Sequence, residues 1–100
     1  MLLLAGNKLT SVPAELGRLT GLKEELTLTG NLLTSVPEEL GGLTNLTALY
    51  LDGNRLTSVP AALGELTALT GLDLSHNMLT SVPEELGVWW CRLIPNLTKG

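Results

Sequence analysis

The side chains that could do chemistry in this 100-residue chain are few and lie far apart in the sequence. There is one histidine, His76, and one cysteine, Cys91. A catalytic nucleophile needs an activating base and a third group that orients the base, and no third group stands near either residue. One histidine and one cysteine also do not make a zinc set. We therefore expect no catalytic residue, no metal site and no cofactor.

Asp52 and Asp73 are the other candidates, because two close carboxylates can act as general acid and base. Asp52 follows one pair of alternating leucines, and Asp73 lies between the leucines of the next pair. If these two leucine segments are neighbours in the fold, the two carboxylates could lie close together. We expect the surface around these two aspartates to be shallow, with no pocket for a substrate. The glycines are spaced as repeat punctuation and form no phosphate-binding loop. The sequence therefore predicts a protein that is not an enzyme.

The overall charge narrows the class of partner. Six basic and ten acidic residues give a net charge of −4 and a pI near 4.8, whereas phosphate binding needs clustered lysine and arginine. No apolar run approaches the roughly 18 residues of a membrane-spanning helix. We expect a protein partner, with no nucleic acid and no membrane span.

Cellular location rests on weaker signals. Residues 1–5 are too short, and lack the basic flank, for a signal peptide. This favours a cytoplasmic protein, with secretion as the alternative if a missing upstream segment carries a signal peptide. The Asn-x-Thr triplets at Asn45 and Asn96 would become glycosylation acceptors only in that secreted case.

The residues that do recur form an internal repeat. The pentapeptide Leu-Thr-Ser-Val-Pro occurs four times, each copy preceded by an asparagine and ending at Pro13, Pro37, Pro60 and Pro83. The unit is LxxLxLxxNxLTSVPxxLGxLTx, and the chain holds 26 leucines and no phenylalanine. This composition suits a single repeated leucine layer, as in stacked repeat proteins, and not a core of mixed side-chain shapes.

This unit resembles the leucine-rich repeat family, in particular its 23-residue class with a VPxxLGxL segment, which intracellular Ras-interacting leucine-rich proteins also carry. The resemblance covers about residues 2–89. It implies an α/β fold: a right-handed solenoid or horseshoe arc, with four short parallel strands on the concave face and short helical or 3₁₀ turns on the convex face. It also implies that the concave face binds protein partners.

The spacing of the leucines supports this arrangement independently. Leucines that alternate with other residues are typical of half-buried strands, and they occur as Leu2/Leu4, Leu26/Leu28, Leu49/Leu51 and Leu72/Leu74. Each Pro-x-x-Leu-Gly segment predicts one helical or 3₁₀ turn, with proline in its first position and glycine as its stop. We expect each repeated asparagine to bond backbone groups of its own and the adjacent coil.

The second repeat contains one extra residue before Leu26. We expect a bulge at Glu24 or Glu25, because an unpaired charge does not enter a leucine layer. The repeat fails after Gly87. We therefore divide the chain into a leucine-rich repeat domain, residues 1–87, and an irregular C-terminal cap or tail, residues 88–100.

The two ends of the repeat array raise further alternatives. The indoles of Trp89-Trp90-Cys91 would either cover the last coil or anchor a partner. No capping segment stands ahead of the first strand. This predicts a fragment of a longer array, or end-to-end self-association through uncapped termini.

Side chains between the leucines of a strand point away from the core. We predict that these outward side chains, together with Arg55 beside the repeated asparagine Asn54, form the protein-binding surface. Its residues are Glu25, Thr27, Thr29, Tyr50, Asp52, Arg55, Asp73 and Ser75. Tyr50 beside carboxylates suits a polar or basic peptide surface, unless its ring only covers a solvated sheet. The sequence predicts a non-catalytic protein-binding module. The alternative is a fragment of a larger signalling enzyme, such as a kinase, GTPase or ubiquitin ligase.

Overall fold

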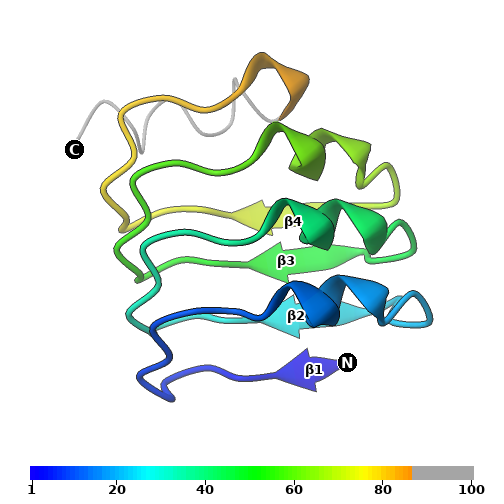
Figure 1. Ribbon diagram of the computed structural model, residues 1–100, viewed down its shortest axis with the longest axis horizontal. Coiled ribbons are helices and arrows are strands. Elements are labelled where there is room, and N and C mark those ends of the chain that lie inside the picture. The colour runs from blue at the N-terminus through cyan, green and yellow to red at the C-terminus, as the bar shows by residue number, and fades with distance from the viewer. Residues whose placement is uncertain (87–100) are drawn as a thin grey trace.

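A computed structural model of the chain, which describes residues 1–86, alternates a short strand with a 3₁₀ turn four times (Figure 1). The strands are β1 (Leu2–Leu3), β2 (Glu25–Thr27), β3 (Ala48–Tyr50) and β4 (Gly71–Asp73). The turns are η1 (Ala14–Arg18), η2 (Glu38–Gly42), η3 (Ala61–Glu65) and η4 (Glu84–Leu86). Each strand and the turn after it form one coil, and the four coils stack in sequence order. The predicted α/β solenoid of four short strands is confirmed.

All four strands are parallel and form one sheet in the order β1-β2-β3-β4. The register aligns equivalent positions of the repeat, so that Leu26 pairs with Leu49 in the next strand. Tyr50 likewise pairs with Thr27 on one side and Asp73 on the other. Because side chains alternate along a strand, the leucines share one face of the sheet and the polar residues share the other.

One leucine layer fills the space between the sheet and the 3₁₀ turns. In the two central coils its members are fully buried: Leu26, Leu28, Leu33, Leu40, Leu43, Leu46, Leu49, Leu51 and Leu56. The corresponding leucines of the first coil, among them Leu2, Leu4 and Leu22, are only partly buried. Full burial of a leucine contributes about 1.5–3 kcal/mol, so the central coils carry most of the hydrophobic stabilisation.

The repeated proline precedes each 3₁₀ turn and does not occupy its first position, so this detail of the predicted turn is wrong. Pro13 is extended, with φ −69° and ψ 146°, and η1 begins at the next residue. The Pro13 carbonyl accepts a hydrogen bond from the Leu16 amide at 3.1 Å. The proline ring therefore fixes the extended entry to the turn, and its carbonyl closes the turn.

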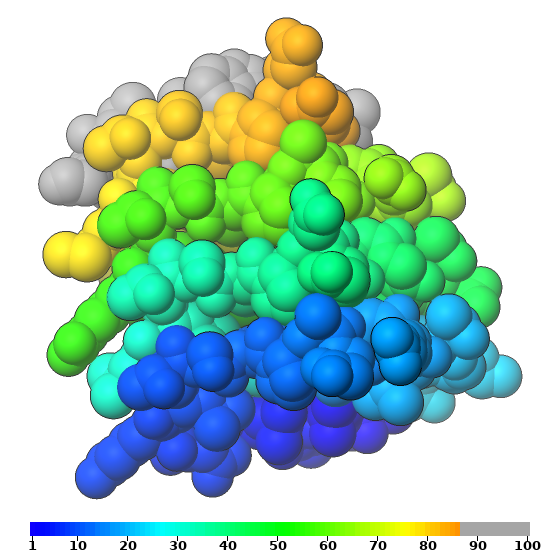
Figure 2. Space-filling model, viewed as in Figure 1, coloured from blue at the N-terminus to red at the C-terminus, as the bar shows by residue number. Residues whose placement is uncertain are grey.

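The repeated glycine does not stop the turn; it lets neighbouring coils touch. A Cβ on Gly17 would lie 2.1 Å from the carbonyl oxygen of Glu39, and one on Gly64 would lie 2.3 Å from that of Glu85. No side chain fits at such distances from backbone atoms. Glycine recurs because the 3₁₀ turns of successive coils pack backbone against backbone. Figure 2 shows the successive coils in contact.

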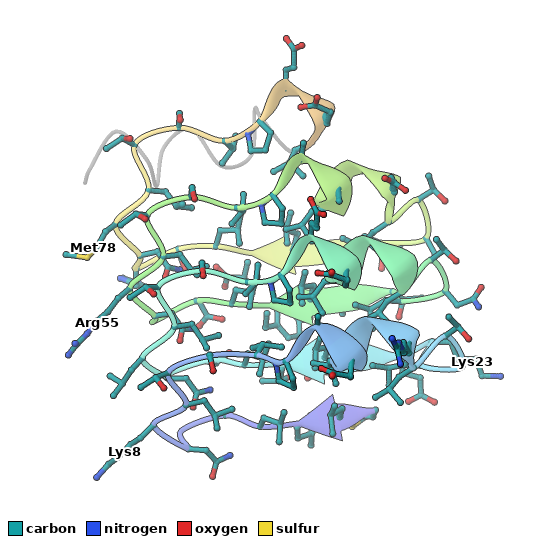
Figure 3. All side chains as sticks on the ribbon, in the orientation of Figure 1. Lys8, Lys23, Arg55 and Met78 are labelled. Atoms are coloured by element: carbon teal, nitrogen blue, oxygen red, sulfur yellow. The ribbon has the colours of Figure 1, made fainter. Side chains whose placement is uncertain are left out.

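The extra residue of the second repeat is accommodated at Lys23, and the expected bulge at Glu24 or Glu25 is wrong. Glu25 lies in β2 and keeps its register with β3. The Glu24 carbonyl accepts bonds from two amides at the start of β3, both at 3.1 Å, and the Thr47 carbonyl accepts two at the start of β4, at 2.8 and 3.1 Å. Glu24 thus occupies a regular repeat position. Lys23, one residue earlier, is exposed and extends outward from the edge of the stack (Figure 3).

The predicted cap and the domain division cannot be compared with the described residues. The cap, residues 88–100 with its Trp89-Trp90-Cys91 segment, lies beyond them, so the domain division at residue 87 stays a prediction. Within residues 1–86, no helix has the length and hydropathy needed to cross a membrane.

Candidate functional site

A ladder of three asparagines, the buried Asn31 and Asn54 and the half-buried Asn77, fixes the chain just beyond β2, β3 and β4. The Asn31 Nδ2 atom donates to the carbonyls of Leu4 and Leu28, both at 2.9 Å. Its Oδ1 atom accepts from the amides of Asn7 and Leu9 at 2.9 and 3.0 Å. One amide side chain therefore joins two coils through four bonds. This confirms the prediction that the repeated asparagine bonds its own coil and the adjacent one.

The later asparagines repeat this bridge one coil at a time. Asn54 donates to Leu51 in its own coil and to Leu28 in the preceding coil, both at 2.9 Å. Asn77 does the same with Leu74 and Leu51, at 3.1 and 2.9 Å. The backbone at the ends of the strands is thereby held in place, and the outward side chains there stand on a rigid support.

Seven of the eight predicted surface residues lie on the face of the sheet opposite the leucine layer. We call this surface the strand face; it consists of Glu25, Thr27, Thr29, Tyr50, Asp52, Asp73 and Ser75, all half-buried. The strand register places three of these side chains in one row: Thr27, Tyr50 and Asp73. The repeat places Thr29, Asp52 and Ser75 in a second row beside it.

Hydroxyl groups of the strand face hold its carboxylates. Thr29 Oγ1 donates to Asp52 Oδ1 in the next coil at 2.8 Å. Ser75 donates to Asp73 Oδ1 through its hydroxyl at 2.6 Å and its amide at 2.9 Å. A carboxylate offers about four lone-pair sites, so these bonds orient each aspartate and leave acceptor capacity for an incoming donor.

The Tyr50 ring extends from β3 toward β4. A Cβ on Gly71 would lie 3.4 Å from the Tyr50 hydroxyl oxygen and 3.8 Å from its Cε1 atom. The ring therefore lies over Gly71, which has no side chain to displace it. Tyr50 covers the sheet at this point while staying half-exposed, which gives the strand face one flat aromatic surface.

Arg55, the eighth predicted residue, is not part of the strand face. It is exposed and points outward from the edge at which the strands end, in line with Lys8 and Met78 (Figure 3). The turn before it includes Gly53, whose φ of 69° bends the chain away from the sheet. Sequence spacing places Arg55 close to Tyr50 along the chain, but the direction of this turn is not readable from spacing.

Within residues 1–86, His76, Asp52 and Asp73 each occupy a position that the geometry of the coils explains. His76 has a φ of 55°, similar to the 69–71° of Gly6, Gly30 and Gly53, so it fills the turn position that glycine holds in the other coils. Asp52 and Asp73 each accept a hydroxyl bond within the strand face. In residues 1–86, no group of three or more His, Cys, Asp or Glu side chains is placed to hold a metal ion. Cys91 lies outside the described residues.

Comparison with known proteins agrees with the coil geometry. The family model described as "Leucine rich repeat" matches residues 1–56 and 44–87. A solved structure of a leucine-rich repeat protein from Leptospira interrogans is 45% identical, has a TM-score of 0.74, and aligns with 79% of this chain and 20% of that chain. The chain thus spans about a fifth of the length of that protein. No curated protein matches the sequence.

Proposed function

Since the chain belongs to the leucine-rich repeat family, we propose that it is a non-catalytic module whose strand face binds a protein partner. The observation that carries this proposal is the strand face itself. Its side chains differ from coil to coil, while the leucines and asparagines beneath them repeat. The underlying backbone is held by the leucine layer and the asparagine ladder, so little conformational entropy is lost on association.

The chemistry of the strand face favours a polar or basic segment of the partner. Three of its side chains are carboxylates, Glu25, Asp52 and Asp73, and none is a cation. Carboxylates form their strongest hydrogen bonds with arginine and lysine. Tyr50 adds a ring that can stack on an arginine side chain or on apolar stems.

The size of the strand face favours a peptide or a single loop over a large globular surface. Four strands have three gaps of roughly 4.8 Å, which makes the sheet about 14 Å wide. Standard protein interfaces bury about 800 Å² on each partner, more than such a strip offers. We therefore propose that the partner contributes one extended segment that crosses the strands.

A selection with random displayed peptides tests this proposal directly. The full chain is immobilised, and enriched peptides are retested on a variant that combines Tyr50→Ala with Asp52→Lys. We expect the enriched peptides to carry basic residues. Their affinity for this variant should fall at least about tenfold, because buried aromatic and charge contacts dominate interfaces.

The matched control combines Met78→Ala with Glu65→Lys, which also removes one large side chain and reverses one charge, but at exposed sites away from the strand face. Peptide binding to this control should equal that of the unchanged protein. Peptides that bind the Tyr50/Asp52 variant as well as the unchanged protein would move the binding site off the strand face and contradict the proposal.

A further inference from the structure

Arg55, which is not part of the strand face, belongs to a separate row of side chains at the edge where the strands end. Each coil contributes to this row the residue that directly follows its repeated asparagine. We call it the edge row; it consists of Lys8, Leu32, Arg55 and Met78. Figure 3 shows Lys8, Arg55 and Met78 pointing outward from the same side of the stack, whereas Lys23 points outward from the other side.

Backbone hydrogen bonds hold the edge row in register from coil to coil. The amide of Arg55 donates to the carbonyl of Leu33 at 2.8 Å, and the amide of Met78 donates to that of Leu56 at 2.9 Å. The amide at the same position of the second coil makes the equivalent bond to the first coil, at 2.8 Å. Because successive coils lie about 4.8 Å apart, the row presents side chains at regular intervals on a fixed backbone.

The edge row alternates cations with apolar side chains that a partner can cover. Lys8 and Arg55 are exposed, Leu32 in the coil between them is half-buried, and Met78 is 63% exposed. Covering a large apolar side chain is favourable, and methionine adapts its shape to different partners. The row runs along the side of the stack, so neither end of the coil array determines its exposure (Figure 1).

The segments that carry the edge row contain no acidic residue, although the whole chain has a net charge of −4. These four segments are residues 6–13, 30–37, 53–60 and 76–83. Two of the four lysines and arginines in residues 1–86 stand in the row. The nearest acid along the chain, Asp52, accepts the Thr29 hydroxyl on the strand face. The edge row is therefore a cationic strip, opposite in charge to the strand face.

We propose that the edge row binds an amphipathic helix of a partner protein whose contacting face alternates acidic and apolar residues. An α-helix laid along the row has a pitch of about 5.4 Å, close to the spacing of the coils. Residues i, i+4, i+7 and i+11 of such a helix share one face, so each can meet one coil. Carboxylates at i and i+7 then pair with Lys8 and Arg55. Apolar side chains at i+4 and i+11 cover Leu32 and Met78.

Other occupants fit the edge row less well. Side chains on one face of an extended segment recur at about 6.7 Å, so they fall out of step with the coils after one or two contacts. The helix differs from the coil spacing by only about 0.6 Å per turn, which long side chains in the row can accommodate. Nucleic acid or an anionic membrane would need more cations than the two in the row, since such binding depends on clustered lysine and arginine.

A selection from displayed helix-forming peptides, randomised at i, i+4, i+7 and i+11 of one face, tests the proposal with the full chain as target. We expect enriched peptides with acids and apolar residues in alternation on that face. In fluorescence anisotropy at low salt, Arg55→Glu should weaken their binding at least about fivefold, because one ion pair becomes a repulsion. The matched control is Lys23→Glu, which changes the net charge equally at an exposed site on the other side of the stack. It should bind the peptides as the unchanged chain does.

An exchange of charges supplies a second readout. Replacing one of the two peptide acids with lysine should restore binding to Arg55→Glu, whereas replacing the other should not, because only one acid lies opposite this position. The absence of acidic and apolar alternation among the enriched peptides, equal losses for Arg55→Glu and Lys23→Glu, or failure of both charge exchanges would each overturn the proposal. Displacement of the peptides by vesicles of anionic phospholipid would assign the row to a membrane surface and would also contradict it.

Discussion

At single positions, asparagine side chains form hydrogen bonds with backbone groups that the leucine layer excludes from water. Leucine side chains cannot form such bonds. Asn54 is 7% exposed and donates to carbonyls of two coils, while its Oδ1 atom accepts from the Leu33 amide at 3.1 Å. Its role was predictable from the sequence, because a polar residue inside a strictly repeated apolar pattern must be bonded. The position of Arg55 was not predictable, because it depends on the direction of one turn.

Replacing Asn54 with alanine should lower the free energy of unfolding by about 1–3 kcal/mol, because buried backbone groups lose their partners. Urea denaturation followed by circular dichroism measures the loss. Asn7→Ala is the control, since Asn7 holds the same repeat position but is exposed in the first coil. It should cost less than about 0.5 kcal/mol. Equal losses for the two variants would contradict the structural role of the ladder.

At the scale of elements, stability depends on how closely the 3₁₀ turns pack. The sequence predicted the turns and their glycines, but attributed the glycines to termination. The real constraint is contact between residues of adjacent repeats, such as Gly64 and the Glu85 carbonyl, and that distance is not a property of either turn alone. The Lys23 insertion is similar. The position of the inserted residue follows from which carbonyl accepts the hydrogen bonds of the next coil. That pairing exists only between stacked coils.

Gly64→Ala should destabilise the protein by about 1–3 kcal/mol, because its Cβ would lie 2.3 Å from a backbone oxygen and the coils would have to separate. Gly21→Ala is the matched control, since no heavy atom lies within 4 Å of its Cβ position and its φ is not in the left-handed region. That variant should be unchanged, or more stable by up to about 1 kcal/mol. Thermal unfolding of both variants compares them directly. A Gly64→Ala protein as stable as the unchanged chain would show that the turns are not in contact.

At the scale of the whole molecule, the four coils share one leucine layer, and each coil is covered only by its neighbours. The repeat period and the leucine spacing predicted stacked short strands, because leucines at period 2 are typical of a strand with one buried face, and the resemblance to leucine-rich repeats implied the solenoid. They were not sufficient to predict that the leucine side chains are fully buried in the central coils and only partly buried in the first coil. That difference comes from stacking, which a repeat unit viewed alone does not contain.

Leu49→Ala should reduce the free energy of unfolding by about 2–5 kcal/mol, because Leu49 is 0% exposed in the centre of the layer and its loss leaves a cavity. Met78→Ala removes a side chain of similar size that is 63% exposed, and it should cost less than about 0.5 kcal/mol. Urea denaturation of both variants gives the comparison. Similar losses would mean that the leucines do not form a common interior.

The central claim, that the strand face binds a protein segment while the leucine layer supports it, is tested most directly by a nuclear magnetic resonance titration. The isotope-labelled full chain is titrated with a displayed-peptide binder, and the amide shifts are mapped on the fold. The account predicts the largest shifts at Thr27, Tyr50 and Asp73, with η1 to η3 unchanged. The largest shifts at the 3₁₀ turns, with the Thr27–Tyr50–Asp73 row unmoved, would contradict it.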